Sequence, residues 1–266
     1  MRKPFLAAAI VAIVIGTFGP ALAVDIGGLN VPVGSVFSVA QIYENVPTAI
    51  GDTLAGYGKV DSINSIPVGN LCTGCELTYQ FGGYTVAAVS PTEIRFSGGF
   101  IKFYLGFGAD NDFTTGNAGG SAGDLAEATN GTLFLTVKGH AVDAAGNTFI
   151  GTGVNIGTIV PTGFGSGLLD VDTNAGGIAN AFFDTNSIVA AFGGPADFQT
   201  GSSFTALNPV YPSECPGGPA CLRGSADATG SVRDARNPED VPEPATYFLM
   251  LTGLGALGFV SARRRA

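Results

Sequence analysis

The 266-residue chain contains no tryptophan and a single histidine, His140, and only 12% of its residues are charged. A lone histidine on a segment that reads as a strand has a structural role more often than a catalytic one. A Gly-x-Ser-x-Gly nucleophile elbow, a phosphate-binding loop and a dinucleotide-binding fingerprint are also absent from any strand-to-helix context. These absences predict a protein that is not an enzyme and that holds no cofactor.

Basic residues are scarce once the two ends of the chain are set aside. The chain has 12 Lys and Arg against 21 Asp and Glu. Residues 24–244 contain 7 of the basic and all 21 of the acidic residues, a formal charge of −14. Because a phosphate backbone needs a basic face, this balance excludes a nucleic-acid partner. We interpret the acidity as an aid to solubility, with binding of divalent cations as the alternative.

The first 23 residues have the three parts of a secretory signal peptide. Arg2 and Lys3 form a basic start, residues 5–18 are apolar, and Ala21 and Ala23 stand in a small-x-small cleavage site. The sequence therefore predicts processing by signal peptidase and a mature chain that begins at Val24.

The last 26 residues, 241–266, form a second topogenic segment. Val-Pro-Glu-Pro-Ala is followed by an uncharged apolar run over 246–262 and then by Arg263, Arg264 and Arg265. The run has the length of a short transmembrane helix, and the arginines place the C-terminus in the cytoplasm by the positive-inside bias. The prolines of the preceding motif cannot continue a helix and keep the chain extended outside the membrane.

This order of motif, apolar helix and arginine cluster resembles the PEP-CTERM sorting signal of Gram-negative bacteria. The resemblance covers about 26 residues at the chain end and implies no fold for the remainder. It implies that an exosortase recognises Pro242, Glu243 and Pro244, that residues 246–262 insert transiently into the inner membrane, and that Arg263 to Arg265 act as the stop. The implied destination after cleavage is the cell surface or the exopolysaccharide matrix. A permanent tail anchor is the alternative if no exosortase is encoded.

Residues 24–230 read as an all-β body. Short segments rich in β-branched and aromatic residues recur at intervals of about ten residues, separated by Gly, Asn and Asp, which favours an antiparallel β-sandwich or jelly roll. We expect strands over 36–44, 76–89, 95–107, 132–142, 148–151, 165–171, 179–184, 187–192, 203–207 and 222–231. Two of these segments contain Gly-Gly pairs, at 82–83 and 98–99. Residues 76–89 read as two strands around the first pair, with a hairpin or a bulge between them. After the second pair, strict alternation places Ile101, Phe103, Leu105 and Phe107 on one face of a half-buried strand.

Two segments of the body lack strand patterns. Residues 108–130 are polar and glycine-rich and read as a long surface loop with a helical turn at 124–128. Residues 231–240 read as a flexible linker between the body and the sorting tail.

The four cysteines fall in two close pairs. Cys72 and Cys75 flank Thr-Gly, and Cys215 and Cys221 flank Pro-Gly-Gly-Pro-Ala. In an exported chain we interpret each pair as a disulfide that closes its own turn. Cross-pairing, a shared zinc site and a redox role for Cys72 and Cys75 are the alternatives.

Some acidic residues resemble calcium ligands, although we interpret them as solvated turn residues and predict no metal site. Asp170, Asp172 and Asn174 open like an Asp-x-Asp-x-Asn calcium loop, although Ala175 stands where such loops require glycine and no glutamate closes the loop. Asp110 with Asp112, and Asp124 with Glu127, are carboxylate pairs without a demonstrated cleft.

Three functions are compatible with these features. The favoured one is a structural or adhesive protein of the cell surface, the exopolysaccharide matrix or a biofilm. The alternative is a lectin-like carbohydrate-binding module in which tyrosines supply stacking platforms, although the absence of Trp weakens it. A secreted glycan hydrolase that uses an acidic pair is the third. The candidate platform residues are Tyr43, Tyr57, Tyr79, Tyr84 and Tyr104.

Overall fold

The computed structural model describes residues 23–115, 120–206 and 221–233, and these residues form one predominantly antiparallel β structure. The strands are β1 (Ala23–Ile26), β2 (Leu29–Pro32), β3 (Val36–Asn45), β4 (Thr53–Lys59), β5 (Ser62–Ile63), β6 (Ile66–Pro67), β7 (Cys75–Val89), β8 (Glu93–Phe107), β9 (Thr132–His140), β10 (Asn147–Val154), β11 (Thr162–Val171), β12 (Phe198–Ala206) and β13 (Cys221–Gly230). The helices are α1 (Val68–Leu71), the 3-10 turn η1 (Gly108–Asp110), α2 (Gly120–Ala128) and α3 (Asn180–Phe183).

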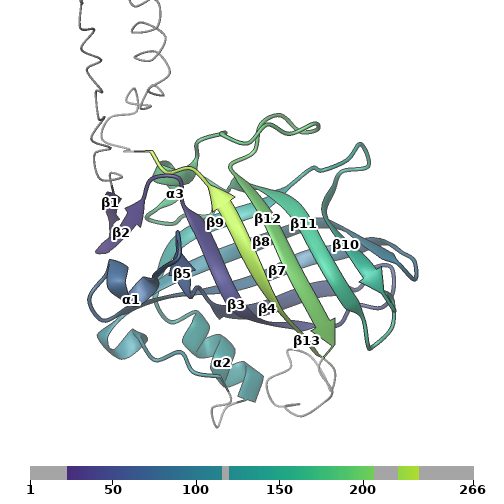
Figure 1. Ribbon diagram of the computed structural model, residues 1–266, viewed down its shortest axis with the longest axis horizontal. Helices are drawn as coiled ribbons and strands as arrows, with labels where there is room; N and C mark the ends of the chain where they lie inside the picture. The colour runs from purple at the N-terminus through teal and green to yellow at the C-terminus, as the bar shows by residue number, and fades with distance from the viewer. Residues whose placement is uncertain (1–22, 116–119, 207–220, 234–266) are drawn as a thin grey trace, which may run out of the picture.

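The main sheet closes on itself into a barrel (Figure 1). Its hydrogen-bonded order runs from β13 through β12, β11, β10, β8, β7 and β4 to β3, and β13 then pairs with β3. Strands β9 and β10 share one position, because each pairs with a different part of β8 and of β11. The wall therefore has eight positions. The remaining small strands lie outside this circuit.

The expectation of a sandwich is wrong, although the all-β antiparallel class is confirmed. The difference lies in one pairing, in which Leu222 of β13 stands opposite Glu44 of β3 and Ala228 opposite Phe37. Inward and outward residues alternate along a strand in a sandwich and in a barrel alike, so the alternation predicted for the body fits both. Only the contact between the first and last long strands separates the two architectures.

Several local expectations are confirmed. Strand β8 buries Phe103 and Leu105 on one face, as its alternation predicts, but Ile101 of the same set is half-buried and Phe107 is 40% exposed. Opposite β4, the Gly82–Gly83 pair forms a bulge rather than a hairpin, since Leu54 pairs with Tyr84 and Gly56 with Phe81. β7 therefore runs on as one strand, and the expectation of two strands over 76–89 is wrong. The helical turn predicted near residue 124 is present as α2, which packs on the outside of β4 and β7.

Two predicted strands are wrong. Residues 179–184 form the short helix α3, and residues 187–192 contribute only an isolated bridge between Ile188 and Ala196. The side chain of Asn180 explains the first case. Its Oδ1 accepts a hydrogen bond from the Thr136 backbone N–H, and its Nδ2 donates to the carbonyls of Asp172 and Gly176. The Asn180 side chain thus makes hydrogen bonds to β9 and to the turn after β11 that a neighbouring strand would otherwise make.

One end of the barrel, which we call the packed end, is where β3 begins and β13 ends. The small strands β1 and β2 and the helices α1 and α3 gather there (Figure 1). Phe183 of α3 inserts between Phe37 and Phe198, with ring centroids 5.5 and 5.4 Å away, and Phe37 also meets Phe103 at 5.8 Å. These rings form one continuous apolar core with the buried faces of β1, β2 and α1.

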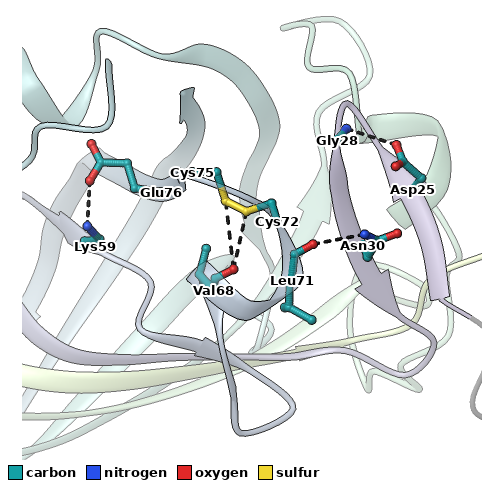
Figure 2. The surroundings of a disulfide bond; sticks show 9 residues. All are labelled: Asp25, Gly28, Asn30, Lys59, Val68, Leu71, Cys72, Cys75 and Glu76. Carbon is teal, nitrogen blue, oxygen red and sulfur yellow. Dashed lines mark hydrogen bonds and ion pairs between the residues drawn. A yellow bond between two sulfur atoms is a disulfide. The ribbon is translucent and has the colours of Figure 1, made fainter. Parts of the chain in front are cut away.

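A disulfide between Cys72 and Cys75 lies beside this end, after α1 (Figure 2). Both sulfur atoms lie near the Val68 carbonyl oxygen, at 3.4 and 4.0 Å. The last carbonyl of α1, that of Leu71, accepts a hydrogen bond from the Asn30 side chain of β2 at 3.2 Å. The small hairpin and the disulfide-closed turn are therefore attached to each other as well as to the barrel. Cys215 and the side chain of Cys221 lie outside the described residues.

The chain after β13 continues along the packed end. Val232 is buried in the same core, and the Arg233 backbone N–H donates to the Phe182 carbonyl. The predicted linker over 231–240 therefore starts with packed residues. The remainder of that linker lies outside the described residues, and so do the predicted sorting tail over 241–266 and nearly all of the signal peptide over 1–23. Within the part of the chain that the structure describes, no helix is long and apolar enough to span a membrane.

Candidate functional site

The other end of the barrel, the cavity end, is where β3 ends and β13 begins. An apolar cavity of about 120 Å³ reaches from the middle of the barrel toward the turns at this end. Eight aromatic rings line it, together with aliphatic side chains and a few polar ones. The rings belong to Phe37, Tyr79, Phe81, Tyr84, Phe96, Phe103, Phe149 and Phe204.

Glycines on the inner face of β10 and β11 make room for these rings. The Phe149 ring lies directly over Gly165, where a Cβ atom would collide with it. A Cβ on Gly163 would stand 2.9 Å from Phe204 Cζ, closer than real Cβ atoms approach. A β-branched residue, the usual choice in a strand, would displace the Phe149 ring at position 165 and would collide with the Thr152 carbonyl of β10 at position 163. The glycine-rich composition of this segment is therefore a packing requirement of the cavity wall.

The turn between β10 and β11 lies across the mouth of the cavity. Its Ile156 is buried and its backbone N–H donates to the Pro91 carbonyl at 3.1 Å. On the same turn Ile159 and Val160 are 66% and 55% exposed, and Ile50 on the neighbouring β3–β4 turn is 69% exposed. The two turns that supply Pro47, Ile156 and Pro161 to the cavity wall thus also expose apolar side chains to solvent, an arrangement that favours entry of apolar molecules.

Glu44 is the only charged side chain among the described residues that line this cavity. It stands one residue before the end of β3, on the face that also carries Ile42, and only 9% of its surface is exposed. In the described part of the chain its carboxyl has no hydrogen-bond or ion-pair partner. Burial raises its pKa to about 8, so the acid is protonated at neutral pH.

Other polar groups of the cavity are engaged or stay neutral. The Thr200 hydroxyl donates to the Asp227 carbonyl at 3.1 Å, and the Tyr79 hydroxyl donates to the Gln41 carbonyl at 3.4 Å. Burial raises the pKa of Tyr79, with the nearby Glu44 adding to the effect, and burial also raises the pKa of Tyr84. Both phenols therefore keep their protons at neutral pH.

The tyrosines expected as carbohydrate platforms are mostly inside the protein. Tyr43, Tyr57, Tyr79 and Tyr84 are each at most 5% exposed, whereas Tyr104 is partly exposed. Tyr43 and Tyr57 stack on each other beneath the segment that carries α2. A buried ring cannot receive a sugar on its face, so four of the five positions offer no platform.

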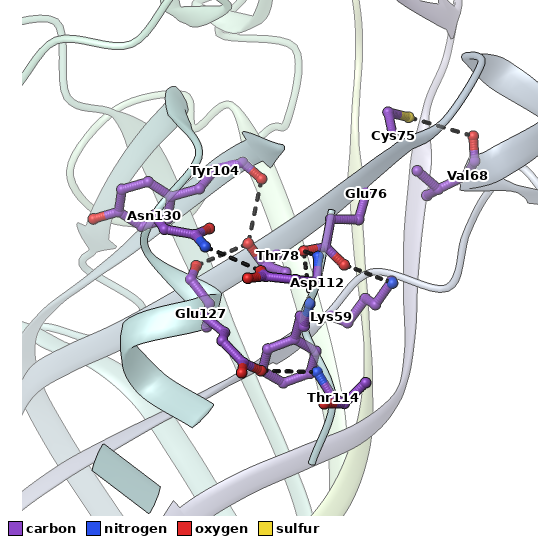
Figure 3. Close-up of polar contacts among 12 residues, drawn as sticks. Lys59, Val68, Cys75, Glu76, Thr78, Tyr104, Asp112, Thr114, Glu127 and Asn130 are labelled. Carbon is purple, nitrogen blue, oxygen red and sulfur yellow. Dashed lines mark hydrogen bonds and ion pairs between the residues drawn. The ribbon is translucent and has the colours of Figure 1, made fainter. Parts of the chain in front are cut away.

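A buried carboxylate of β7 holds the 108–130 excursion to the outer wall of the barrel (Figure 3). Buried Glu76 of β7 accepts hydrogen bonds from the backbone N–H groups of Asp112 and Phe113 at 3.1 and 3.0 Å and pairs with Lys59 at 2.7 Å. Nearby, Asp112 accepts from the Asn130 side chain, and Glu127 accepts from the Thr114 backbone.

Asp124, the partner of Glu127 in the predicted acidic pair, is buried and accepts a hydrogen bond from the Tyr57 hydroxyl at 3.3 Å. Glu76 and Asp124 therefore anchor the excursion to the barrel, whereas Asp112 and Glu127 connect parts of the excursion to each other. None of the contacts places a pair across the barrel cavity.

A second, more polar groove of about 430 Å³ lies on the outer surface, between β3, β4 and the start of the excursion. Side chains of Gln41, Lys59, Asp61 and Thr114 line it.

His140 is buried on the outer face of β9, opposite the side that faces the core. Its Nδ1 lies 2.8 and 2.9 Å from the two oxygens of Asp170, and its Nε2 lies 2.7 Å from the Phe192 carbonyl. Burial alone would lower the pKa of His140, but these hydrogen bonds raise it above its ordinary value. Two acceptors favour the doubly protonated ring, so His140 is a structural ion-pair partner of Asp170.

The calcium candidates lie at the end of β11 and in the turn after it. Asp170 is hydrogen-bonded to His140, and Asp172 Oδ1 accepts from the Asn174 backbone N–H at 3.2 Å. Among the residues that the structure describes, no group of three or more His, Cys, Asp or Glu is placed to hold a metal ion.

Sequence reasoning missed Glu44 as a site residue. The signal was present, because Ile42 and Glu44 alternate onto the same face of the strand predicted over 36–44. A carboxyl on a buried face is the informative exception to the apolar pattern. Without the barrel closure, however, nothing marks that face as the wall of a cavity.

Comparison with known proteins identifies the C-terminal segment alone. Residues 240–265 match the model of the PEP-CTERM protein-sorting motif, which confirms the resemblance of Pro242, Glu243, Pro244 and the arginines at 263–265 to that signal. The motif implies export and processing by an exosortase. No curated protein matches the chain, and no solved structure matches it.

Proposed function

We propose that this exported, exosortase-processed protein is a non-enzymatic binding protein of the cell surface or exopolysaccharide matrix, whose barrel holds a small apolar molecule. The observation that carries the proposal is the aromatic-lined cavity at one end of a barrel whose other end is filled. The proposal assigns no catalytic step and no cofactor to the body.

The size of the cavity limits the ligand. Ligand pockets for drug-sized molecules enclose roughly 300–1,000 Å³, whereas an apolar cavity of about 150 Å³ holds benzene. A cavity of about 120 Å³ therefore fits a molecule of about one six-membered ring. Burial of such a molecule replaces contacts that the surrounding rings lack in the empty cavity.

A binding experiment with two matched variants tests this proposal. Ala226 lies on the cavity face of β13, and Thr229 lies on the opposite, exposed face of the same strand. We expect the purified chain to bind toluene saturably, as measured by ligand-observed NMR. Ala226→Leu fills the cavity and should weaken binding about tenfold or more, the loss of roughly 1.4 kcal/mol. Thr229→Leu should bind as the unmodified chain does, and equal binding by both variants, or no saturable binding, overturns the proposal.

A second candidate function is carbohydrate binding in the outer polar groove. Its support is the set of hydrogen-bonding side chains that line the groove, including Gln41 and Asp61. In a pull-down with the host's exopolysaccharide, Gln41→Ala should reduce the retained fraction while the cavity variant Ala226→Leu leaves it unchanged. A structural or adhesive role in the matrix would also retain the chain on the polymer, but Gln41→Ala would not change that retention.

A further inference from the structure

Glu44 occupies a position in which no described residue compensates an ionised carboxylate. Its cross-strand neighbours are Gly56 of β4, which has no side chain, and Leu222 of β13. Leu222 and Leu54 line the same cavity as Glu44. A buried carboxylate without a partner loses its hydration and gains nothing in return, so it takes up a proton instead. The raised pKa of about 8 follows from that burial.

The described groups that face Glu44 from the surrounding strands supply no opposite charge. Strand β7 contributes Tyr79 and Tyr84, both of which remain neutral, and β12 contributes the hydroxyls of Thr200 and Ser202. The described residues that line the cavity from β4, β8, β10 and β13 are apolar. Lys59 and Arg223 lie on the outer surface, where Lys59 pairs with Glu76 and Arg223 lies over the Tyr43 ring.

We propose that the protonated carboxyl of Glu44 is the recognition group of the barrel cavity. Its ligand is a neutral, apolar molecule of about one six-membered ring, with one carbonyl oxygen that accepts a hydrogen bond from Glu44. This inference rests on the proposed binding function and specifies its ligand class. No covalent step is involved, and the proton stays on Glu44.

The choice of a carbonyl over an amine follows from the state of the acid. A protonated carboxyl in an apolar site donates a strong hydrogen bond to an oxygen acceptor. An amine would instead require Glu44 to ionise, and the resulting ion pair would be buried among rings with no further hydrogen bonds. A ligand that binds only the protonated acid must lose affinity when Glu44 titrates.

Three probes of equal size separate these cases. Cyclohexanone has the carbonyl oxygen, methylenecyclohexane has CH₂ in its place, and protonated cyclohexylamine is a cation. Binding of each probe to the purified chain is measured by ligand-observed NMR at pH 6.5 and pH 9.5. At pH 6.5 we expect cyclohexanone to bind about tenfold more tightly than methylenecyclohexane, as one hydrogen bond predicts. At pH 9.5 this preference should disappear.

Two variants of Glu44 test whether that side chain is responsible. Glu44→Gln keeps a hydrogen-bond donor but cannot ionise, so the preference for cyclohexanone should persist at both pH values. Glu44→Leu removes the donor and should bind both neutral probes alike. Thermal unfolding of each variant establishes that it is folded, and Glu44→Gln, which nearly preserves shape, remains informative if Glu44→Leu does not fold.

Several outcomes overturn the inference. Equal affinity for the two neutral probes at pH 6.5 would do so while leaving the proposed binding function intact. Tighter binding of cyclohexylamine that Glu44→Gln abolishes would assign Glu44 to an ion pair instead. Failure of every probe to bind overturns the proposed function together with the inference.

Discussion

The two ends of the barrel are lined by the same kinds of residues, but one end is a filled core and the other contains a cavity. At the packed end Phe37, Phe183 and Phe198 meet in one aromatic core, because α3 and the β1–β2 hairpin lie across it. At the cavity end Phe149 and Phe204 point inward in the same way, but no described helix or strand lies across them. Inward alternation thus creates an apolar lumen, and whether that lumen becomes a core or a cavity depends on what fills it.

The filling elements come from long excursions between barrel strands. Helix α3 stands between β11 and β12, and α1 stands between β4 and β7. At the cavity end, the described turns of the barrel are short, and they contribute single side chains such as Ile156. The difference between the ends therefore resides in the connections and not in the strands.

The largest expected effect comes from removing a ring at the packed end. Phe183→Ala deletes a fully buried ring and should lower the free energy of unfolding by about 3–5 kcal/mol. Phe204→Ala at the cavity end should lower it by only about 1–2 kcal/mol, because that ring is partly buried and already borders empty space. Urea unfolding of both variants measures the difference, and equal losses would contradict the contrast between the ends.

A pH effect is expected from the cavity end. The pKa of Glu44 is about 8 in the folded protein and 4.5 as an ordinary glutamate, so between these values the folded chain holds one more proton than the unfolded chain. Stability contributed by this group therefore falls as pH rises, by up to about 1.4 kcal/mol per pH unit. Relative to the unmodified chain, Glu44→Gln should gain about 2–3 kcal/mol between pH 5 and pH 7 in urea unfolding. Parallel pH profiles for the two proteins would show that Glu44 is not buried as described.

The disulfide beside the packed end should contribute stability but no binding. Replacing Cys72 and Cys75 together by alanine removes a four-residue closure, for which chain entropy gives about 2 kcal/mol. We expect a lower urea midpoint and unchanged toluene binding, because the cavity lies at the opposite end. A change in toluene affinity with unchanged stability would mean that the two ends are coupled.

The smallest effect is expected on the outer wall, away from both ends. The raised pKa of His140 means that its ion pair with Asp170 stabilises the fold below pH 6.5 and that this contribution is lost as pH rises through the folded-state pKa. Asp170→Asn should lower the free energy of unfolding by about 1 kcal/mol at pH 6 and by less at pH 9. NMR titration of the His140 ring would show its pKa moving downward in this variant. An unshifted titration would contradict the assigned pairing.

Sequence patterns predicted the elements that local chemistry defines. The alternation that buries Phe103 and Leu105 marks β8, and Gly82–Gly83 marks the bulge in β7. The patterns failed where distant contacts decide. Strand β4 was missed because Gly56 and Gly58 weaken its strand signal, yet both glycines lie so close to neighbouring strands and rings that no Cβ fits.

The candidate site was predicted less well than the fold. The sorting motif was recognised because its parts are contiguous, and the family comparison confirms it over 240–265. Four of the five tyrosines proposed as platforms lie on strands that the sequence predicts, but the sequence does not show which face of the wall their side chains occupy. Tyr79 and Tyr84 face the cavity, while Tyr43 and Tyr57 lie under the outer excursion.

By itself, the sequence determined the sorting signal of this protein and the all-β class of its body. The sorting motif is a contiguous run of residues, so it can be identified without knowledge of the fold. Tertiary structure alone decided that the body closes into a barrel, that α3 fills one end, and that Glu44 faces an apolar cavity at the other. The reason is physical: strand alternation fixes which side chains share a face, whereas the pairing of β3 with β13 joins residues nearly two hundred positions apart and decides what that face encloses.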